Sequence, residues 1–177
     1  MTAALLLAGV TLGPPALDRE LKPFDLQGSE VARSFRACSA AQEKPRFPDT
    51  KFKSIRVFMR SGPSILDCRI MVFPDRESLL EWDKQMTFGS PAWFSPFRNK
   101  PKDGVHRSAL GGMITEGLRM PEAAIVGRFV ITVRPEHSVQ YSRHHPEEEK
   151  HRLSNKKQND LSAKAMDELI KRAKKAS

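Results

Sequence analysis

Residues 52–73 read FKSIRVFMRSGPSILDCRIMVF, and this stretch decides the fold class. On both sides of Gly62 and Pro63, apolar residues alternate with polar ones, which is the period of a strand with one buried face. The runs 52–60 and 64–73 therefore predict an antiparallel hairpin joined by a tight turn. Cys68 falls on the buried side of this hairpin, where a packing role is expected for its thiol.

On the N-terminal side of the hairpin, the sequence predicts one helix. Ser29 can cap a helix over residues 30–42, because Val31, Phe35 and Cys38 fall on a single helical face. Residues 17–28 before it are predicted to form a connector.

On the C-terminal side, four further segments are predicted. Asp75 can cap a helix over residues 76–86. A second hairpin is expected to follow, then a mobile polar excursion and a final helix that is capped by Asp160 or Ser162. The strands of this hairpin are predicted over residues 108–119 and 124–134, with residues 120–122 joining them. The excursion covers residues 135–159, and the final helix ends near residue 175.

These elements together predict an α+β fold. The antiparallel sheet has about four strands in two hairpins, and about three helices pack mainly on one of its faces. Residues 29–177 are predicted to form a single α+β domain.

The N-terminal residues 1–16 contain a candidate signal peptide. Residues 3–13 read AALLLAGVTLG, and Pro14 and Pro15 follow them, as in a cleavage zone. No Lys or Arg precedes the apolar run, so a buried N-terminal strand or helix is the alternative. The run is too short to span a bilayer. A secreted or periplasmic location is predicted, or a cytoplasmic one if the leader is not cleaved.

The chain contains two cysteines, Cys38 and Cys68. In an exported protein they could form a disulfide that closes a loop of about 30 residues. In a cytosolic protein, two buried thiols are expected instead.

The chain is basic, with a formal net charge of +9. Residues 91–177 hold 17 Lys and Arg against 10 Asp and Glu, so most of the excess lies in the second half. Such a surface attracts anionic ligands or polymers without choosing among them. Nucleic acid is one candidate partner.

Candidate binding residues lie in two places. Residues 87–107 combine three prolines with aromatic and basic side chains, which suit a flat anionic ligand. The outward strand faces add a row of arginines, which can form one basic surface. The predicted ligand-binding residues are Trp93, Phe94, Phe97, Arg98, Lys100, Arg128 and Arg134, and the other outward arginines are Arg56, Arg60 and Arg69.

Signals for chemistry are weak. The tract from His144 to His151 contains imidazoles and carboxylates but lacks the spacing of a metal site, so a solvated charged loop is predicted. Neither a cofactor nor a metal is expected. The favoured hypothesis is an exported, non-enzymatic domain that binds an anionic ligand or partner. The alternatives are an intracellular nucleic-acid-binding module and, less favoured, a small hydrolase or metal-dependent enzyme.

Overall fold

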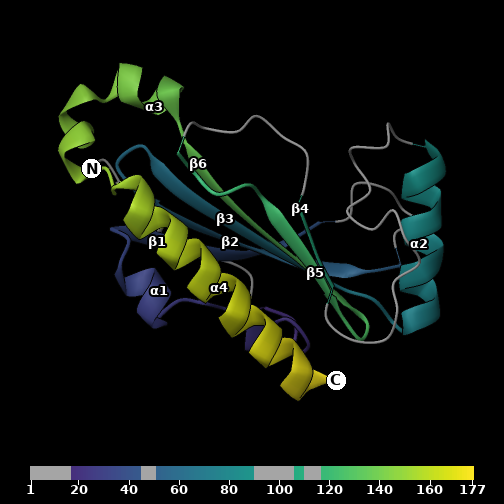
Figure 1. Cartoon of the computed structure of the whole chain (residues 1–177). Helices are drawn as coiled ribbons and strands as arrows, with labels where there is room; N and C mark the ends of the chain where they lie inside the picture. Colours follow the sequence, from purple (N-terminus) through teal and green to yellow (C-terminus); the bar gives the residue numbers. More distant parts are fainter. Residues whose placement is uncertain (1–16, 45–50, 90–105, 110–116) are drawn as a thin grey trace, which may run out of the picture.

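The computed structural model of the chain describes residues 17–44, 51–89, 106–109 and 117–177 (Figure 1). One antiparallel sheet has six strands in the order β1-β2-β3-β6-β5-β4, so the predicted α+β class is confirmed with more strands than expected. The strands are β1 (Ala37–Glu43), β2 (Lys53–Ser61), β3 (Ser64–Val72), β4 (His106–Ala109), β5 (Glu122–Val126) and β6 (Phe129–His137). The helices are α1 (Glu30–Arg33), α2 (Arg76–Gly89), α3 (Val139–His144) and α4 (Asn155–Ala176), with 3-10 turns η1 (Lys22–Phe24) and η2 (Pro146–His151).

The β2–β3 hairpin forms as the alternating sequence predicts. Ser61 lies opposite Ser64, so Gly62 and Pro63 alone make the turn. Gly62 has a φ of 55°, which suits the first central position of a type II′ turn and favours glycine there. A Cβ at this position would also collide with the backbone carbonyl of Glu148. The glycine therefore lets η2 approach the turn closely.

The expected second hairpin is wrong in its boundaries. Residues 124–134 do not form one strand, because Gly127, with a φ of 57°, turns the chain between β5 and β6. The turn places Ile125 on the opposite face of the sheet from Phe129 and Ile131. The earlier partner strand is β4, whose four residues pair with β5. An apolar run interrupted by a single glycine does not reveal this turn by its period.

The helix expected over residues 30–42 is also wrong. Ser29 caps a helix as predicted, and its Oγ accepts a hydrogen bond from the backbone N–H of Ala32, but the helix ends at Arg33. The chain then becomes β1, which pairs with β2 along its whole length. Tertiary pairing has overridden a helical spacing that the sequence permits. Cys38 therefore lies on a strand.

Residues 17–28 belong to the core instead of forming a connector. Leu21, Phe24 and Leu26 have no exposed surface, and the rings of Phe24 and Phe129 have centroids 5.3 Å apart. This N-terminal segment runs beneath the sheet and contacts α4 through η1. The folded domain thus includes these residues.

The helices divide between the two faces of the sheet. α1 and α4 share the larger apolar cluster with Ile55, Cys68 and Ile131, and Figure 1 shows α4 lying across this side. α2 packs on the other face, where Leu79 joins a smaller cluster around Phe73. Packing mainly on one face therefore describes α1 and α4 but not α2.

The polar excursion expected over residues 135–159 is ordered. Ser138 caps α3, and the residues after it form η2. α4 begins at Asn155, five residues before the earlier of the two predicted caps, with the Oγ of Ser154 accepting from the N–H of Lys157. Hydrogen bonds hold this segment to the β2–β3 turn: Ser61 Oγ donates to the carbonyl of His151, and the N–H of Leu153 donates to Ser64 Oγ.

If residues 17–28 are part of the core, Phe24→Ala should destabilise the protein severely. We expect a loss of about 3–5 kcal/mol in the free energy of unfolding, because the substitution leaves a cavity beside Phe129. Urea denaturation of the full chain measures it. Lys22→Ala, at an exposed position of the same segment, is the control and should change stability by less than about 0.5 kcal/mol. Equal effects of the two substitutions would contradict the inclusion of this segment in the core.

Candidate binding surface

The face of the sheet turned away from α4 has a polar half, which we call the open face. Side chains alternate across each strand, so those next to the buried residues of β1, β2, β3 and β6 point to this side. α2 covers only the apolar end of it. The open face consists of Ala37, Ser39, Ala41, Glu43, Arg56, Phe58, Arg60, Asp67, Arg69, Thr132, Arg134 and Glu136.

Three arginines of the open face are held by carboxylates. Arg56 donates from Nε and Nη2 to the two oxygens of Asp67, at 2.8 and 2.9 Å. Arg69 pairs with Glu43 at 2.9 Å, and Arg134 pairs with Glu136 at 3.1 Å. The three arginine side chains are 44 to 51% exposed, so each pair adds little to stability.

The cross-strand register explains why these carboxylates are needed. Arg56 lies directly opposite Arg69, and like charges in that position destabilise a sheet. Asp67 lies directly opposite Arg134 and also binds Arg56, so it stands between two cations. The carboxylates offset the repulsion and fix where the guanidinium groups lie.

Arg60 is the exception on the open face. Its guanidinium lies over the ring of Tyr141, 4.4 Å from the centroid, and Tyr141 in turn stacks on His145. Within the described parts of the chain, no carboxylate pairs with Arg60. Arg56 similarly lies over Phe58 at 5.6 Å. The open face thus combines exposed cations with aromatic rings.

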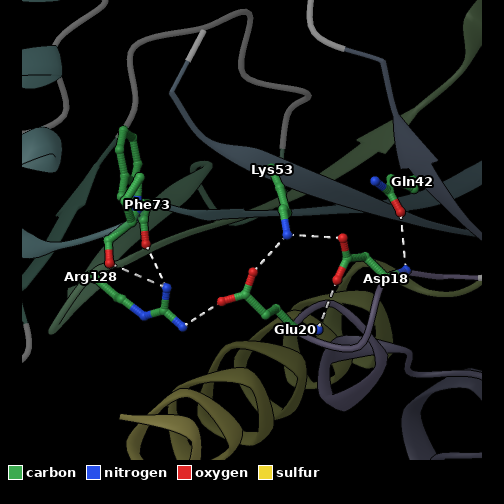
Figure 2. Close-up of polar contacts among 7 residues, drawn as sticks. Asp18, Glu20, Gln42, Lys53, Phe73 and Arg128 are labelled. Atoms are coloured by element: carbon green, nitrogen blue, oxygen red, sulfur yellow. Dashed lines mark hydrogen bonds and ion pairs between the residues drawn. The ribbon is translucent and has the colours of Figure 1, made fainter.

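Of the predicted binding residues, Arg134 lies on the open face but Arg128 does not. Arg128 follows Gly127 in the β5–β6 turn, so the expectation that it points outward from a strand is wrong. Its Nη1 donates to the carbonyl of Phe73, and its Nη2 donates to the carboxylate of Glu20 at 2.9 Å (Figure 2). The turn at Gly127 removes it from the alternation that placed it beside Arg134.

Arg128 instead belongs to a network that anchors the N-terminal segment. Lys53 bridges Glu20 and Asp18 at 2.8 and 2.9 Å, and the N–H of Asp18 donates to Gln42 (Figure 2). The hydrogen bonds from Lys53 lower the pKa of both carboxyl groups. These contacts tie residues 17–28 to β1, β2 and the β5–β6 turn, which is a structural role.

The remaining predicted binding residues lie outside the described residues. These are Trp93, Phe94, Phe97, Arg98 and Lys100. Their part in ligand binding stays a prediction.

The disulfide between Cys38 and Cys68, one of the two alternatives for these cysteines, does not form, and both thiols are free. Cys38 lies on β1 and Cys68 on β3, with β2 between them. Strands are about 4.8 Å apart, so Cα atoms two strands apart lie near 10 Å, beyond the roughly 7 Å that a disulfide spans. Burial raises the pKa of both thiols, most strongly for Cys68, which favours packing over reactivity.

The histidine tract forms the end of α3 and η2. His145 lies 3.5 Å from Glu147, and its ring stacks on Tyr141. In the described segments no group of three His, Cys, Asp or Glu side chains is placed to hold a metal ion. None of the helices described there is long and apolar enough to cross a membrane.

Sequence reasoning missed a buried polar contact at the end of the sheet. Gln158 of α4 is fully buried, and its Nε2 donates to the carbonyls of Ile65 and Glu136 at 2.7 and 3.0 Å. Since the amide nitrogen is used for donation, Oε1 accepts, and Nε2–H of His137 donates to it at 2.7 Å. The spacing of Gln158, Leu161 and Ser162 on one helical face could have indicated it, once α4 was known to begin at Asn155.

Comparison with protein-family models, curated proteins and solved structures finds no match to this chain. The function is therefore argued from the chain's own geometry.

The His137 contact predicts a pH dependence of stability. Burial lowers the pKa of His137, with Arg152 adding to the effect, whereas the Gln158 hydrogen bond and Glu149 oppose it. The unfolded chain therefore binds a proton at a higher pH than the folded chain. The contribution of neutral His137 to the free energy of unfolding is fully present above the pKa of about 6.5 that histidine has in the unfolded chain. It is lost as the pH falls through the lower pKa that His137 has in the folded chain.

Urea denaturation from pH 8 to pH 5 measures this dependence. His137→Gln keeps an amide donor for Gln158 and removes the titration. We expect the free energy of unfolding of the original chain to fall more steeply below pH 6.5 than that of the variant. Parallel curves would show that His137 does not contribute.

Proposed function

We propose that this chain is an exported, non-enzymatic binding domain that contacts an anionic ligand or partner through its open face. One observation carries the proposal: four arginines, Arg56, Arg60, Arg69 and Arg134, share the polar part of one sheet face. Of this face α2 covers only the apolar end, and Tyr141 of α3 contacts Arg60. The clustering of these arginines is not explained by stability, because exposed ion pairs contribute roughly 0–1 kcal/mol each.

The carboxylates on the open face support binding instead of preventing it. A guanidinium has five N–H donors, and Asp67 accepts from two of those on Arg56. The remaining donors stay available to a ligand. Because Asp67 already fixes the geometry of Arg56, less side-chain entropy is lost on binding. Arg60 is held by the ring of Tyr141 and keeps its charge uncompensated within the described residues.

A non-enzymatic role is proposed because, among the described side chains, no Ser or Cys is hydrogen-bonded to a histidine ring. The hydroxyl groups of Ser142 and Ser54 do contact Glu149 and Glu43, but no histidine joins either pair. The Cys68 thiol is buried, with a raised pKa, on the opposite face from the arginines. His137 directs its Nε2 at Gln158. Nucleophilic catalysis requires a base within hydrogen-bond reach of the attacking group.

Binding to anionic probes tests the open face. The variant Arg56→Gln/Arg60→Gln/Arg134→Gln removes three charges and keeps the aliphatic stems. Its affinity for a fluorescent poly-L-glutamate should fall at least roughly tenfold, because charge-assisted hydrogen bonds are lost. The matched control, Lys156→Gln/Lys157→Gln/Lys174→Gln, removes three exposed charges from α4 on the other side of the sheet. It should change affinity less than about twofold.

Two outcomes of this experiment contradict the proposal. An equal loss of affinity in both variants would mean that the probe binds according to the net charge of the protein and not at the open face. Selective loss with oligo(dT) but not with poly-L-glutamate or heparin would favour the nucleic-acid-binding alternative, which also requires a salt-dependent affinity.

Export rests on residues 1–16 alone, since the disulfide that would have supported it does not form. Expression of the chain with these residues intact, followed by mass spectrometry of the N-terminus, tests it. A start near residue 17 in the periplasmic or secreted fraction is expected. An intact Met1 confined to the cytosolic fraction would contradict export.

A further inference from the structure

We propose that the outer edge of β1 accepts an extended, acidic segment of a partner protein as an added strand. The carboxylates of that segment would reach the arginines of the open face. The inference rests on the proposed function and deepens it, because it names the class of partner and the manner of its binding.

β1 is a terminal strand of the sheet. It pairs with β2 through all seven of its residues, from Ala37 opposite Arg60 to Glu43 opposite Ser54. Among the described strands none pairs with its other side. The opposite terminal strand, β4, has only four residues. β1 is therefore the longer template for backbone hydrogen bonds with an incoming strand.

The sequence of β1 lacks the usual defences of an edge. Exposed edge strands are commonly protected by lysine, proline or inward-pointing charges, which discourage pairing with other chains. From Ala37 to Gln42 the strand reads ACSAAQ, with no charge and no proline. The edge is uncharged over its first six residues, and Glu43, which ends it, is paired with Arg69. Such an edge in a highly charged protein points to a partner strand.

The open face continues directly inward from this edge. Ala37, Ser39 and Ala41 are exposed and small, and Arg60, Phe58 and Arg56 lie opposite them on β2. An added strand would lie about 4.8 Å outside β1, so its side chains would start about 10 Å from those of β2. A glutamate and an arginine can together cross that distance, because only an alanine stands between them.

The register also gives the pattern of the partner segment. The side chain opposite Ala37 should be acidic, since Arg60 has no carboxylate partner within the described residues. The side chain opposite Ser39 should be apolar, because it would approach Phe58. A second acid is expected opposite Ala41, where Arg56 retains free donors. The geometry therefore favours acid-x-apolar-x-acid in an extended segment.

A second copy of this chain fits the edge less well. An antiparallel β1 centred on Ala40 would set Arg36 of one copy opposite Lys44 of the other. It would place Glu43 of the second copy opposite Ala37, as Arg60 requires, but only the small Ala41 near Phe58 and the uncharged Ser39 where Arg56 calls for a second acid. Charge and side-chain size both favour a different protein.

Titration of the ¹⁵N-labelled full chain with model peptides tests the proposal. The peptide TETVTET carries the expected pattern, TKTVTKT reverses its charge, and TEPVPET keeps the acids but removes two backbone donors. We expect amide shifts over residues 36–43 with TETVTET and none with TKTVTKT. Alternate β1 amides, exchanging fast in the free chain, should become protected. TEPVPET should bind roughly tenfold more weakly, because it lacks ladder hydrogen bonds.

Variants of the chain assign the contacts. Arg60→Gln should weaken TETVTET binding roughly tenfold, since it removes a charge-assisted contact. Lys157→Gln, an equal charge change on α4, should leave it unchanged. If TEPVPET binds as tightly as TETVTET and both need Arg60, strand addition is wrong while the proposed function stands. If no acidic probe depends on the open-face arginines, the proposed function fails as well.

Amide hydrogen exchange of the free chain is a further measurement that could contradict the proposal. Uniform protection of all β1 amides would mean that the edge is already occupied, by another part of the chain or by a second copy. Light-scattering mass separates these two cases, and either one overturns the proposal.

Discussion

The pairing of β3 with β6 at the centre of the sheet is the constraint on which the structure depends. All nine residues of each strand are in register, from Ser64 opposite His137 to Val72 opposite Phe129. A shift of one residue would exchange the faces of a strand, exposing Cys68 and Ile70 and burying Asp67 and Arg69. The register that builds the apolar core therefore also builds the open face. Neither can change without the other.

The two faces of the sheet differ in how much of their surface is covered by other elements. The side beneath α4 must be apolar along its length, and it draws on the N-terminal segment as well as on α1 and α4 to be covered. The other side is divided, because α2 reaches only the cluster around Phe73. Beyond that cluster the strands meet water, and charged side chains replace apolar ones. The open face is thus the part of the sheet that α2 does not reach. Its arginines need carboxylates because the register sets Arg56 beside Arg69.

The sequence was informative where local period and tertiary pairing agree. Alternation around Gly62 predicted β2 and β3, and it placed Arg56, Arg60 and Arg69 on one outward face. The alternation gave a wrong prediction at Gly127, because one glycine reverses the chain without breaking the apolar run. The predicted place of Arg128 on the outward face was wrong for the same reason. The prediction was also wrong at β1, whose small residues permit a helix and become a strand only because β2 offers a partner. Tyr141 was missed because its contact with Arg60 joins segments far apart in the chain.

The mixture of charges on the open face bears on the kind of anion that it suits. A phosphate or sulfate polymer carries negative charge at every unit, so it would meet Asp67, Glu43 and Glu136 as well as the arginines. An extended polypeptide can place carboxylates at chosen positions and uncharged side chains between them. It also brings backbone donors and acceptors, which a sheet edge can satisfy and a polyanion cannot. An ordered array of paired arginines beside an edge strand that is uncharged over residues 37–42 therefore fits a peptide segment better than a uniform polyanion, because charge and backbone are both matched residue by residue.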